Sequence, residues 1–249
     1  MTGFAAVYRR EVLSLWVTPL AWVLLTVFLL IQGMSFFTIV LHLSNAAQLA
    51  VDAGPIQSWF GQSIFLVLAL LVLCPGVTMR VLAEERKSGT IEALLTAPVT
   101  PAAVVLGKYL ATLTTYVAMW APTLLYVVIL RNTGQVDWPV VGASYLGVLG
   151  TGAGYLAVGV LASSMTESQL VALVMTALVL LGLLILGIGE YVFEPDSILR
   201  EVCATVSVLS KMEEMSRGVV DLRRLVFDST LVALPLFMAV RVVESWRWG

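Results

Sequence analysis

The sequence contains few charged residues, one histidine and two cysteines, and each of these shortages excludes a class of protein. Charged residues make up 12% of its 249 residues, about half the share of an ordinary soluble domain, roughly 25%. The single histidine, His42, excludes a histidine-based metal cluster, and Cys74 and Cys203 are too few for a disulfide framework. Because the net charge is −2, nucleic acid is not an expected partner.

The sequence also lacks the phosphate-binding loop of ATP-hydrolysing proteins. That loop has the pattern G-x-x-x-x-G-K-[ST]. Around Gly107-Lys108, Ala102 stands in place of its first glycine and Tyr109 in place of its hydroxyl residue. We therefore expect no ATPase site on this chain, and no catalytic, cofactor-binding or metal-binding residue.

Hydrophobic residues make up 59% of the chain, and the mean hydropathy is +0.97, which indicates a membrane protein. A helix that crosses a bilayer needs about 20 mostly apolar residues. Uncharged runs cover 12–51, 53–79, 109–130, 138–166 and 168–189. We predict an all-α integral membrane protein, one domain over 1–249, with spans at about 19–42, 58–79, 103–130, 139–163, 168–189 and 226–245. The last span is the weakest prediction, because only 12 uncharged residues separate Asp228 from Arg241.

Residues 1–17 have the pattern of an amphipathic helix rather than of a cleaved signal peptide. One helical face carries Phe4, Val7, Tyr8, Val12, Leu15 and Trp16, while Arg9, Arg10, Glu11 and Ser14 fall mostly on the other. This spacing predicts a helix that lies in the membrane interface. A cytosolic overhang of the first span is the alternative.

The basic residues favour an orientation with both termini in the cytoplasm. Eight of them then lie inside (Arg9, Arg10, Arg80, Arg86, Lys87, Lys108, Arg241 and Arg247) and six outside (Arg131, Arg200, Lys211, Arg217, Arg223 and Arg224). In this orientation the connection 80–102 faces the cytoplasm and the connection 190–225 faces outward. Asp228 and Arg241 are expected at the interfaces, so the mid-membrane is nearly free of ionisable groups. This argues against an ion-driven carrier.

The connection at 80–102 combines a dense charge cluster with a short apolar helical face. It reads RVLAEERKSGTIEALLTAP from Arg80 to Pro98, with a Ser-Gly break before Ile91, Leu94 and Leu95. An apolar helical face that follows a charged segment is suited to docking into a groove of another protein. A solvated loop whose charges only enforce topology is the alternative.

The run MRVLAEERKSGTIEALLTAPVTPAAVVLGKYLA, Met79–Ala111, resembles the membrane subunits of the type-2 ABC transporter (ABC-2) family. The family pattern of Arg, Glu-Glu-Arg, Gly-Thr-x-Glu, Leu-Leu, Pro and Gly-Lys is matched by Arg80, Glu84, Glu85, Arg86, Gly89, Thr90, Glu92, Leu94, Leu95, Pro98, Gly107 and Lys108. Ser207–Leu231 resembles the family's outer segment, so the resemblance extends over essentially the whole chain. Within the family, the short loops and the LLTAPVT run are most similar to Gld-type subunits of gliding-motility operons, with Nos-type subunits next.

The resemblance implies a multi-pass permease subunit of the bacterial cytoplasmic membrane. It has no nucleotide site of its own, because ATP and Mg are held by a separate ABC ATPase subunit. It pairs with a second membrane subunit, identical or related, across a seam expected at spans one and five, and an accessory outer protein can complete the complex. The segment 84–97 is then the coupling helix. Glu84, Glu85 and Arg86 set its contact with the ATPase, and Ile91, Leu94 and Leu95 fill the groove.

Two further patterns bear on packing. Gly147, Gly150, Gly152, Gly154 and Gly159 put small residues on the fourth span, which favours close packing inside the chain over a subunit seam. In the outer segment 190–225, Ile198, Val202, Val206 and Leu209 recur near helical spacing. This predicts two short amphipathic helices that dip into the outer lipid leaflet, with a single soluble cap helix as the alternative.

The favoured function is a permease that moves an amphiphilic substrate, with export preferred over import. A membrane scaffold for a motility or assembly complex, switched by an ATPase without solute transport, is the alternative. An intramembrane enzyme is disfavoured, because metal-dependent forms need H-E-x-x-H and serine forms need a Ser–His pair in the spans.

Overall fold

The protein is all helical over the residues that the computed structural model describes, which are 2–46, 54–61, 63–89, 100–133, 136–194 and 197–246. Six segments of this part are long and apolar enough to cross a membrane. They are Pro19–Leu41, Ile64–Ser88, Pro101–Asn132, Trp138–Met165, Gln169–Tyr191 and Leu222–Ser245. The predicted all-α membrane fold with six spans is confirmed.

The helices follow one another in an order that alternates spans with short connecting elements. Their bounds are α1 Thr2–Val17, α2 Pro19–Ala46, α3 Pro55–Gly61, α4 Ile64–Thr78, α5 Ala83–Ser88, α7 Pro101–Trp120, η1 Ala121–Thr123, α8 Leu124–Thr133, α9 Trp138–Met165, α10 Gln169–Ile188, η2 Gly189–Tyr191, α11 Ile198–Val206, α12 Val208–Ser216 and α13 Leu222–Ser245. The spans are α2, α4, α7 with α8, α9, α10 and α13.

The third span is interrupted, which the charge pattern did not predict. It begins with a cap, since Thr100 Oγ1 accepts a hydrogen bond from the Ala103 N–H at 3.3 Å and Pro101 takes the first helical position. At Ala121–Thr123 the α-helix tightens into one 3-10 turn that contains Pro122. Proline has no N–H and clashes with the preceding turn. The expected single helix over 103–130 is therefore two helices joined by a 3-10 turn.

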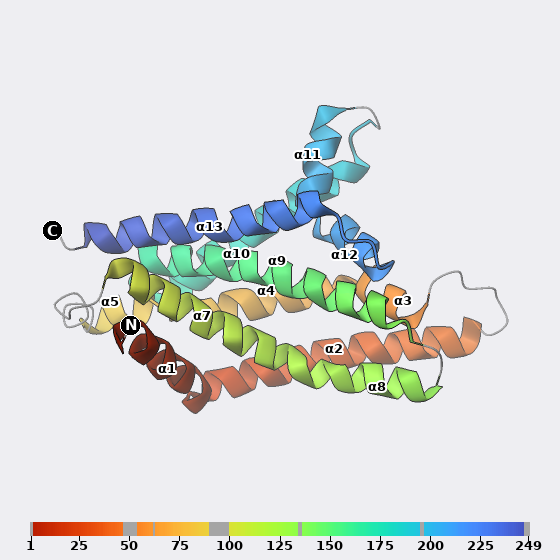
Figure 1. Ribbon diagram of the computed structural model, residues 1–249, viewed down its shortest axis with the longest axis horizontal. Coiled ribbons are helices and arrows are strands. Elements are labelled where there is room, and N and C mark those ends of the chain that lie inside the picture. The colour runs from red at the N-terminus through yellow and green to blue at the C-terminus, as the bar shows by residue number, and fades with distance from the viewer. Residues whose placement is uncertain are drawn as a thin grey trace.

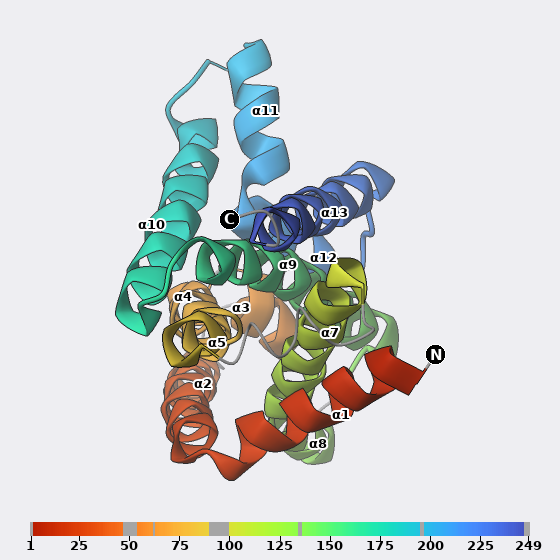
Figure 2. The ribbon, with the colours of Figure 1, turned by 90° about the vertical axis from the view of Figure 1, so that its left-hand side faces the viewer.

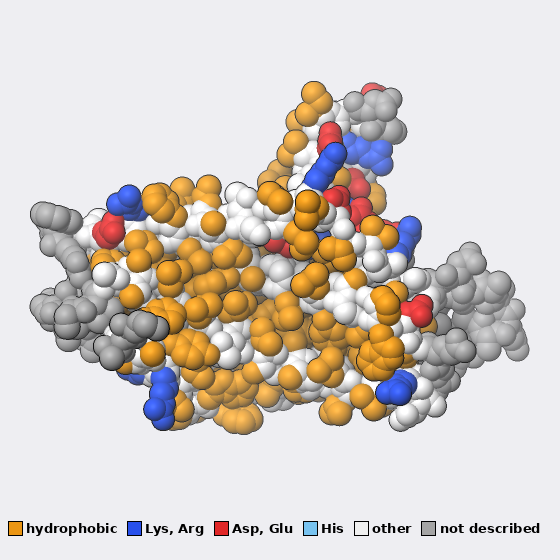
Figure 3. Space-filling view, viewed as in Figure 1, with side chains coloured by type: hydrophobic (Ala, Val, Ile, Leu, Met, Phe, Trp, Pro, Cys, Tyr) orange, Lys and Arg blue, Asp and Glu red, His pale blue; other side chains and the backbone are white. Residues whose placement is uncertain are grey.

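The spans lie side by side along the long axis, and both chain termini lie at one end of the bundle (Figure 1). We call this the terminal end, and it also holds α5. The opposite, distal end holds α3, α12 and the end of α8. Viewed along the spans, α1 runs crosswise to them at the terminal end (Figure 2). Hydrophobic side chains cover the middle of the bundle, and most charged side chains lie toward its ends (Figure 3).

The fourth span, α9, lies at the centre of the packing. In its most apolar window 67% of residues are buried, against 17% for α2 and 22% for α10. The glycines of α9 allow this closeness, because a Cβ at Gly152 would come 2.2 Å from the Tyr116 ring and one at Gly159 would come 2.0 Å from Thr78 Oγ1. The prediction that these glycines pack inside the chain is confirmed, and α2 and α10 keep broad apolar faces exposed.

The segment between the fifth and sixth spans forms two helices, as predicted, and they lie in different environments. Helix α11 stands away from the bundle and runs crosswise to the spans (Figures 1 and 2), with Ile198, Leu199 and Val202 exposed. Helix α12 returns to the distal end, where Val208, Met212 and Met215 are buried.

Candidate coupling site at the terminal end

The start of the connection between the second and third spans is fixed to α9. The side-chain oxygen of Ser163 accepts hydrogen bonds from the N–H groups of Leu82 and Ala83, at 3.0 and 3.1 Å. Helix α5 follows and ends at Gly89, whose φ of +69° is a left-handed conformation that favours glycine. The Ser-Gly break in the sequence is thus a helix end, and the first turn of the connection is held by the bundle.

Lys108, on the third span, is the centre of a buried charge cluster. Its side chain is 1% exposed, and its ammonium lies 2.9 Å from Glu11 Oε2 and 3.1 Å from Glu85 Oε1. A third contact, at 2.7 Å, is with the backbone carbonyl of Val81. An ammonium has three donor hydrogens, and here it has three acceptors. Lys108 therefore joins α1, the connection and α7 in one contact.

Helix α1 contributes to this cluster through a side chain that we expected on its other face. Glu11 is half-buried toward α7, in line with Phe4, Val7 and Leu15. The assignment of Glu11 to the solvent face is wrong, because residues 4, 7, 11 and 15 share one helical stripe. Arg10 approaches from the solvent side and donates to Glu85 Oε1 at 3.3 Å.

The charged residues on the remaining sides of α5 form a shallower set of contacts. Arg80 pairs with Glu84 at 2.9 Å and Arg86 pairs with Glu167 at 3.0 Å. The Arg86 guanidinium also lies over the Trp246 ring, 4.9 Å from its centroid. Lys87 is exposed. Within the run Glu84-Glu85-Arg86, the side chain of Glu85 thus faces the interior, and the side chains of its two neighbours lie toward the surface.

The remaining predicted site residues are divided between described and undescribed parts of the chain. Gly107 lies under α1, because a Cβ there would come 3.2 Å from Val7 Cγ1. Thr90, Ile91, Glu92, Leu94 and Leu95 lie outside the described residues. The docking role of 84–97 stays a prediction.

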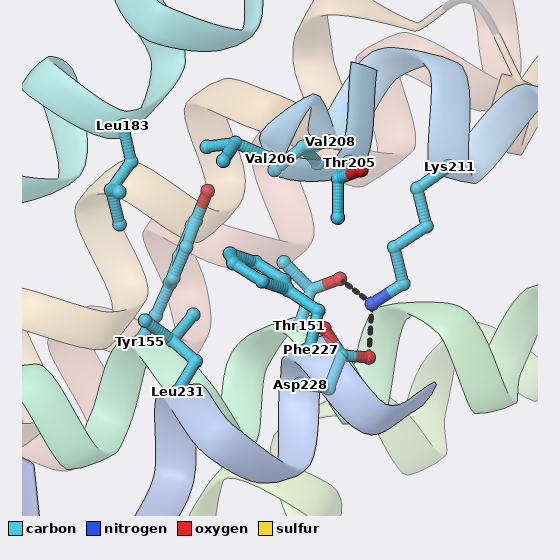
Figure 4. Close-up of a pocket in the computed structure, with 10 residues that line it drawn as sticks. All are labelled: Thr151, Tyr155, Leu183, Thr205, Val206, Val208, Lys211, Phe227, Asp228 and Leu231. Carbon is cyan, nitrogen blue, oxygen red and sulfur yellow. Dashed lines mark hydrogen bonds and ion pairs between the residues drawn. The ribbon is translucent and has the colours of Figure 1, made fainter. Parts of the chain in front are cut away.

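A second charge cluster, which we did not predict, joins α12, α13 and α9 (Figure 4). Lys211 of α12 forms an ion pair with Asp228 of α13, and its ammonium also donates to Thr151 Oγ1 of α9 at 2.8 Å. Lys211 and Asp228 are 4% and 8% exposed. Thr151 is half-way along α9, so the expectation of a mid-membrane nearly free of ionisable groups, with Asp228 at an interface, is wrong.

The sequence carried no signal for this pair, because the two residues are on different helices and neither is in a long uncharged run. Burial lowers the pKa of the Lys211 ammonium from its ordinary value of 10.5, while the adjacent Asp228 carboxylate acts to raise it. A second ion pair joins the same two helices, since Arg224 Nη2 lies 2.7 Å from Glu214 Oε1.

Comparison with known proteins gives one family. A family model described as ABC-2 family transporter protein matches residues 45–206, and no curated protein matches the chain. The match contains the connection 80–102 with Lys108, but neither Glu11 nor the Lys211–Asp228 pair. In this family the membrane protein is the permease part and works with an ABC ATPase, typically beside a second membrane subunit. Because the match covers more than half of the 249 residues, the chain belongs to the ABC-2 transporter family, as a multi-pass permease subunit.

Proposed function

We propose that this permease exports an amphiphilic substrate, driven by an ABC ATPase that docks on residues 84–97 at the terminal end. This end then faces the cytoplasm of a bacterium, with both chain termini inside the cell. Glu84, Arg86 and Lys87 approach the ATPase, and Ile91, Leu94 and Leu95 enter its groove. Glu85 has a different task, which is to seat the connection on Lys108.

The Lys108 cluster is the observation that supports this assignment. A loop that only enforced topology would need its charges exposed to water. Here the first turn of the connection is held by an ammonium with three acceptors and by two hydrogen bonds to Ser163. Movement of the docked segment would therefore be passed to α1, α7 and α9 as rigid bodies.

The distribution of charge supports an amphiphilic substrate. The spans α2, α4, α9 and α10 carry no ionisable Asp, Glu, Lys or Arg, and two of them leave wide apolar faces exposed. The side chains of these four spans would offer a small hydrophilic ion no counter-charge, because the buried ion pair Lys211–Asp228 belongs to α12 and α13. A molecule with an apolar portion would not meet this obstacle.

Purification from the native membrane tests the docking role. The variant Leu94→Ala/Leu95→Ala removes two groove-filling side chains, and Leu124→Ala/Leu125→Ala is the matched control at the exposed start of α8. We expect wild type and control to retain an ABC ATPase and the docking variant to retain at least tenfold less, equivalent to about 1.4 kcal/mol. Equal retention by all three would refute the docking role.

Reconstitution in vesicles tests transport itself. The complex would be given ATP and a fluorescent phospholipid as the amphiphilic probe, with a fluorescent hydrophilic anion as the comparison. ATP-dependent movement of the phospholipid alone supports the proposal. Hydrolysis of ATP with movement of neither probe favours the scaffold role, and movement of the anion alone overturns the assignment of an amphiphile.

A further inference from the structure

Two short helices close the distal end of the bundle. Helix α3 is buried through Ile56, Trp59 and Phe60, and helix α12 packs against it and against α9. Their contact is close, because a Cβ at Gly61 would come 2.6 Å from Ser216 Oγ.

The two helices are attached to the bundle by different forces. Trp59 of α3 packs edge-on against Phe36 and Tyr126, with ring centroids 6.1 and 5.6 Å apart. Such aromatic contacts favour exclusion of water. Helix α12 is attached by buried apolar side chains and, unlike α3 among the described residues, also by a set of ion pairs and hydrogen bonds, whose partners water can replace.

The polar attachments of α12 form a reciprocal set with α13 and its neighbours. Lys211 of α12 pairs with Asp228 of α13, and Arg224 of α13 pairs with Glu214 of α12. Ser210 donates to the Glu190 carboxylate of η2. The apolar part of the contact is made by the buried side chains of Val208, Met212 and Met215, and the two methionines lie against Gly147 of α9.

Among the described residues, buried polar groups without partners lie on α2 and on α3 itself. Gln32 of α2 is 0% exposed, and neither its Nε2 nor its Oε1 has a hydrogen-bond partner within the part of the chain that the structure describes. The same holds for Trp59 Nε1. Gln32 lies one turn inward of Ser35, whose hydroxyl contacts Ser63 at 3.0 Å. A buried amide with no partner is costly, and entry of water would remove that cost.

We propose that α12 is a movable outer plug and that the Lys211–Asp228 pair is the latch that holds it closed. When α12 lifts, water replaces the partners of both charges. The small pocket beside the latch, which Tyr155, Val206 and Leu231 help to line (Figure 4), is the place where the first water enters. This inference rests on the proposed transport function.

Thiol labelling of the whole complex tests the latch without knowledge of the substrate. In a Cys74→Ala/Cys203→Ser background, Met212→Cys places a reporter on the buried side of α12, which is 1% exposed at that residue. A membrane-impermeant cationic methanethiosulfonate is added from the outer side, with and without ATP. Val219→Cys, at a position that is 56% exposed, reports that the reagent reaches the outer face.

The latch predicts a distinct pattern in the rates at which the thiol at 212 is labelled. With the natural pair we expect the thiol at 212 to react at least tenfold faster during ATP hydrolysis than at rest. Asp228→Asn leaves the Lys211 charge without its counter-ion, so in this variant we expect the thiol at 212 to react fast already at rest. Lys211→Met/Asp228→Leu replaces the pair by apolar groups that water does not solvate, so its thiol stays slow in both conditions. The exposed pair Arg223–Glu201 supplies the control, Arg223→Met/Glu201→Leu, which keeps the natural pattern.

The outcomes separate the latch from the proposed function. Hydrolysis of ATP with a thiol at 212 that never accelerates overturns the plug and leaves the transporter role standing. Absence of an ATPase from the complex refutes the proposed function instead. If Asp228→Asn does not fold, the double variant decides, because a double variant with a normal thermal midpoint and a natural labelling pattern refutes the latch.

Discussion

Removal of the Lys108 ammonium is the sharpest test of the buried charge cluster at the terminal end. The variant Lys108→Met keeps the length and apolar stem of the side chain and deletes the charge. Glu11 and Glu85, whose side chains are 13% and 10% exposed, then lose the cation that lies between them. The Val81 carbonyl also loses its hydrogen-bond donor, the ammonium that lies 2.7 Å away. Breaking one partner of a buried ion pair costs about 3–5 kcal/mol.

This cost converts to a large fall in thermal stability. For a domain of this size, 1 kcal/mol corresponds to roughly 2–4 °C in the unfolding midpoint, so we expect a fall of about 6–20 °C. The midpoint is read by size-exclusion chromatography of the detergent-purified protein after heating. Lys87→Met is the matched control, since Lys87 is exposed on the same connection, and we expect it to shift the midpoint by no more than about 2 °C, equivalent to 0.5 kcal/mol or less.

A rescue variant separates charge from packing. In the variant Lys108→Met/Glu11→Gln/Glu85→Gln no uncompensated carboxylate remains. We therefore expect its unfolding midpoint to recover most of the fall seen in Lys108→Met. The reasoning fails if Lys108→Met has the same unfolding midpoint as Lys87→Met, because the ammonium would then contribute nothing to the stability of the charge cluster. It also fails if the triple variant is less stable than Lys108→Met alone.

Two further predictions concern the contacts of α9. Gly159→Ala forces a Cβ to within 2.0 Å of the buried Thr78 hydroxyl, so we expect a loss of about 1–3 kcal/mol. Gly182→Ala, which meets nothing within 4 Å, is the control, and equal midpoints for the two would contradict the close packing. Ser163→Ala leaves the N–H groups of Leu82 and Ala83 without their acceptor, at about 1–3 kcal/mol each. Ser164→Ala is its control, because the Ser164 hydroxyl donates to the Leu161 carbonyl of its own helix. Faster proteolysis at 80–89 in Ser163→Ala alone is the expected readout.

The spans could be predicted from the sequence because their signal is local. A long run without charge excludes most alternatives to a membrane helix, and Thr100-Pro101 marks a helix start through chemistry confined to a few residues. The 3-10 turn at Pro122 was missed although its residue was visible, because a proline inside an apolar run is compatible with a continuous helix, as Pro75 in α4 shows.

The charge clusters could not be predicted, because their signal is not local. Glu11 meets Lys108 across 97 residues of chain, and Lys211 meets Asp228 across 17 residues and a change of direction. In each case one charge on an otherwise apolar face resembled a solvent-facing residue until its partner was known. The family motif indicated that Gly107-Lys108 mattered without indicating that Lys108 faces the interior.

The buried charge cluster around Lys108 has a mechanical consequence. An apolar contact resists compression but separates easily when pulled, since each surface can be covered by lipid. A buried ammonium with three acceptors resists both, because separation would leave charges without partners in a region of low dielectric constant. In the proposed docking role, residues 80–89 would therefore pull α1 and α7 as well as push them, so that one cluster would transmit movement in both directions.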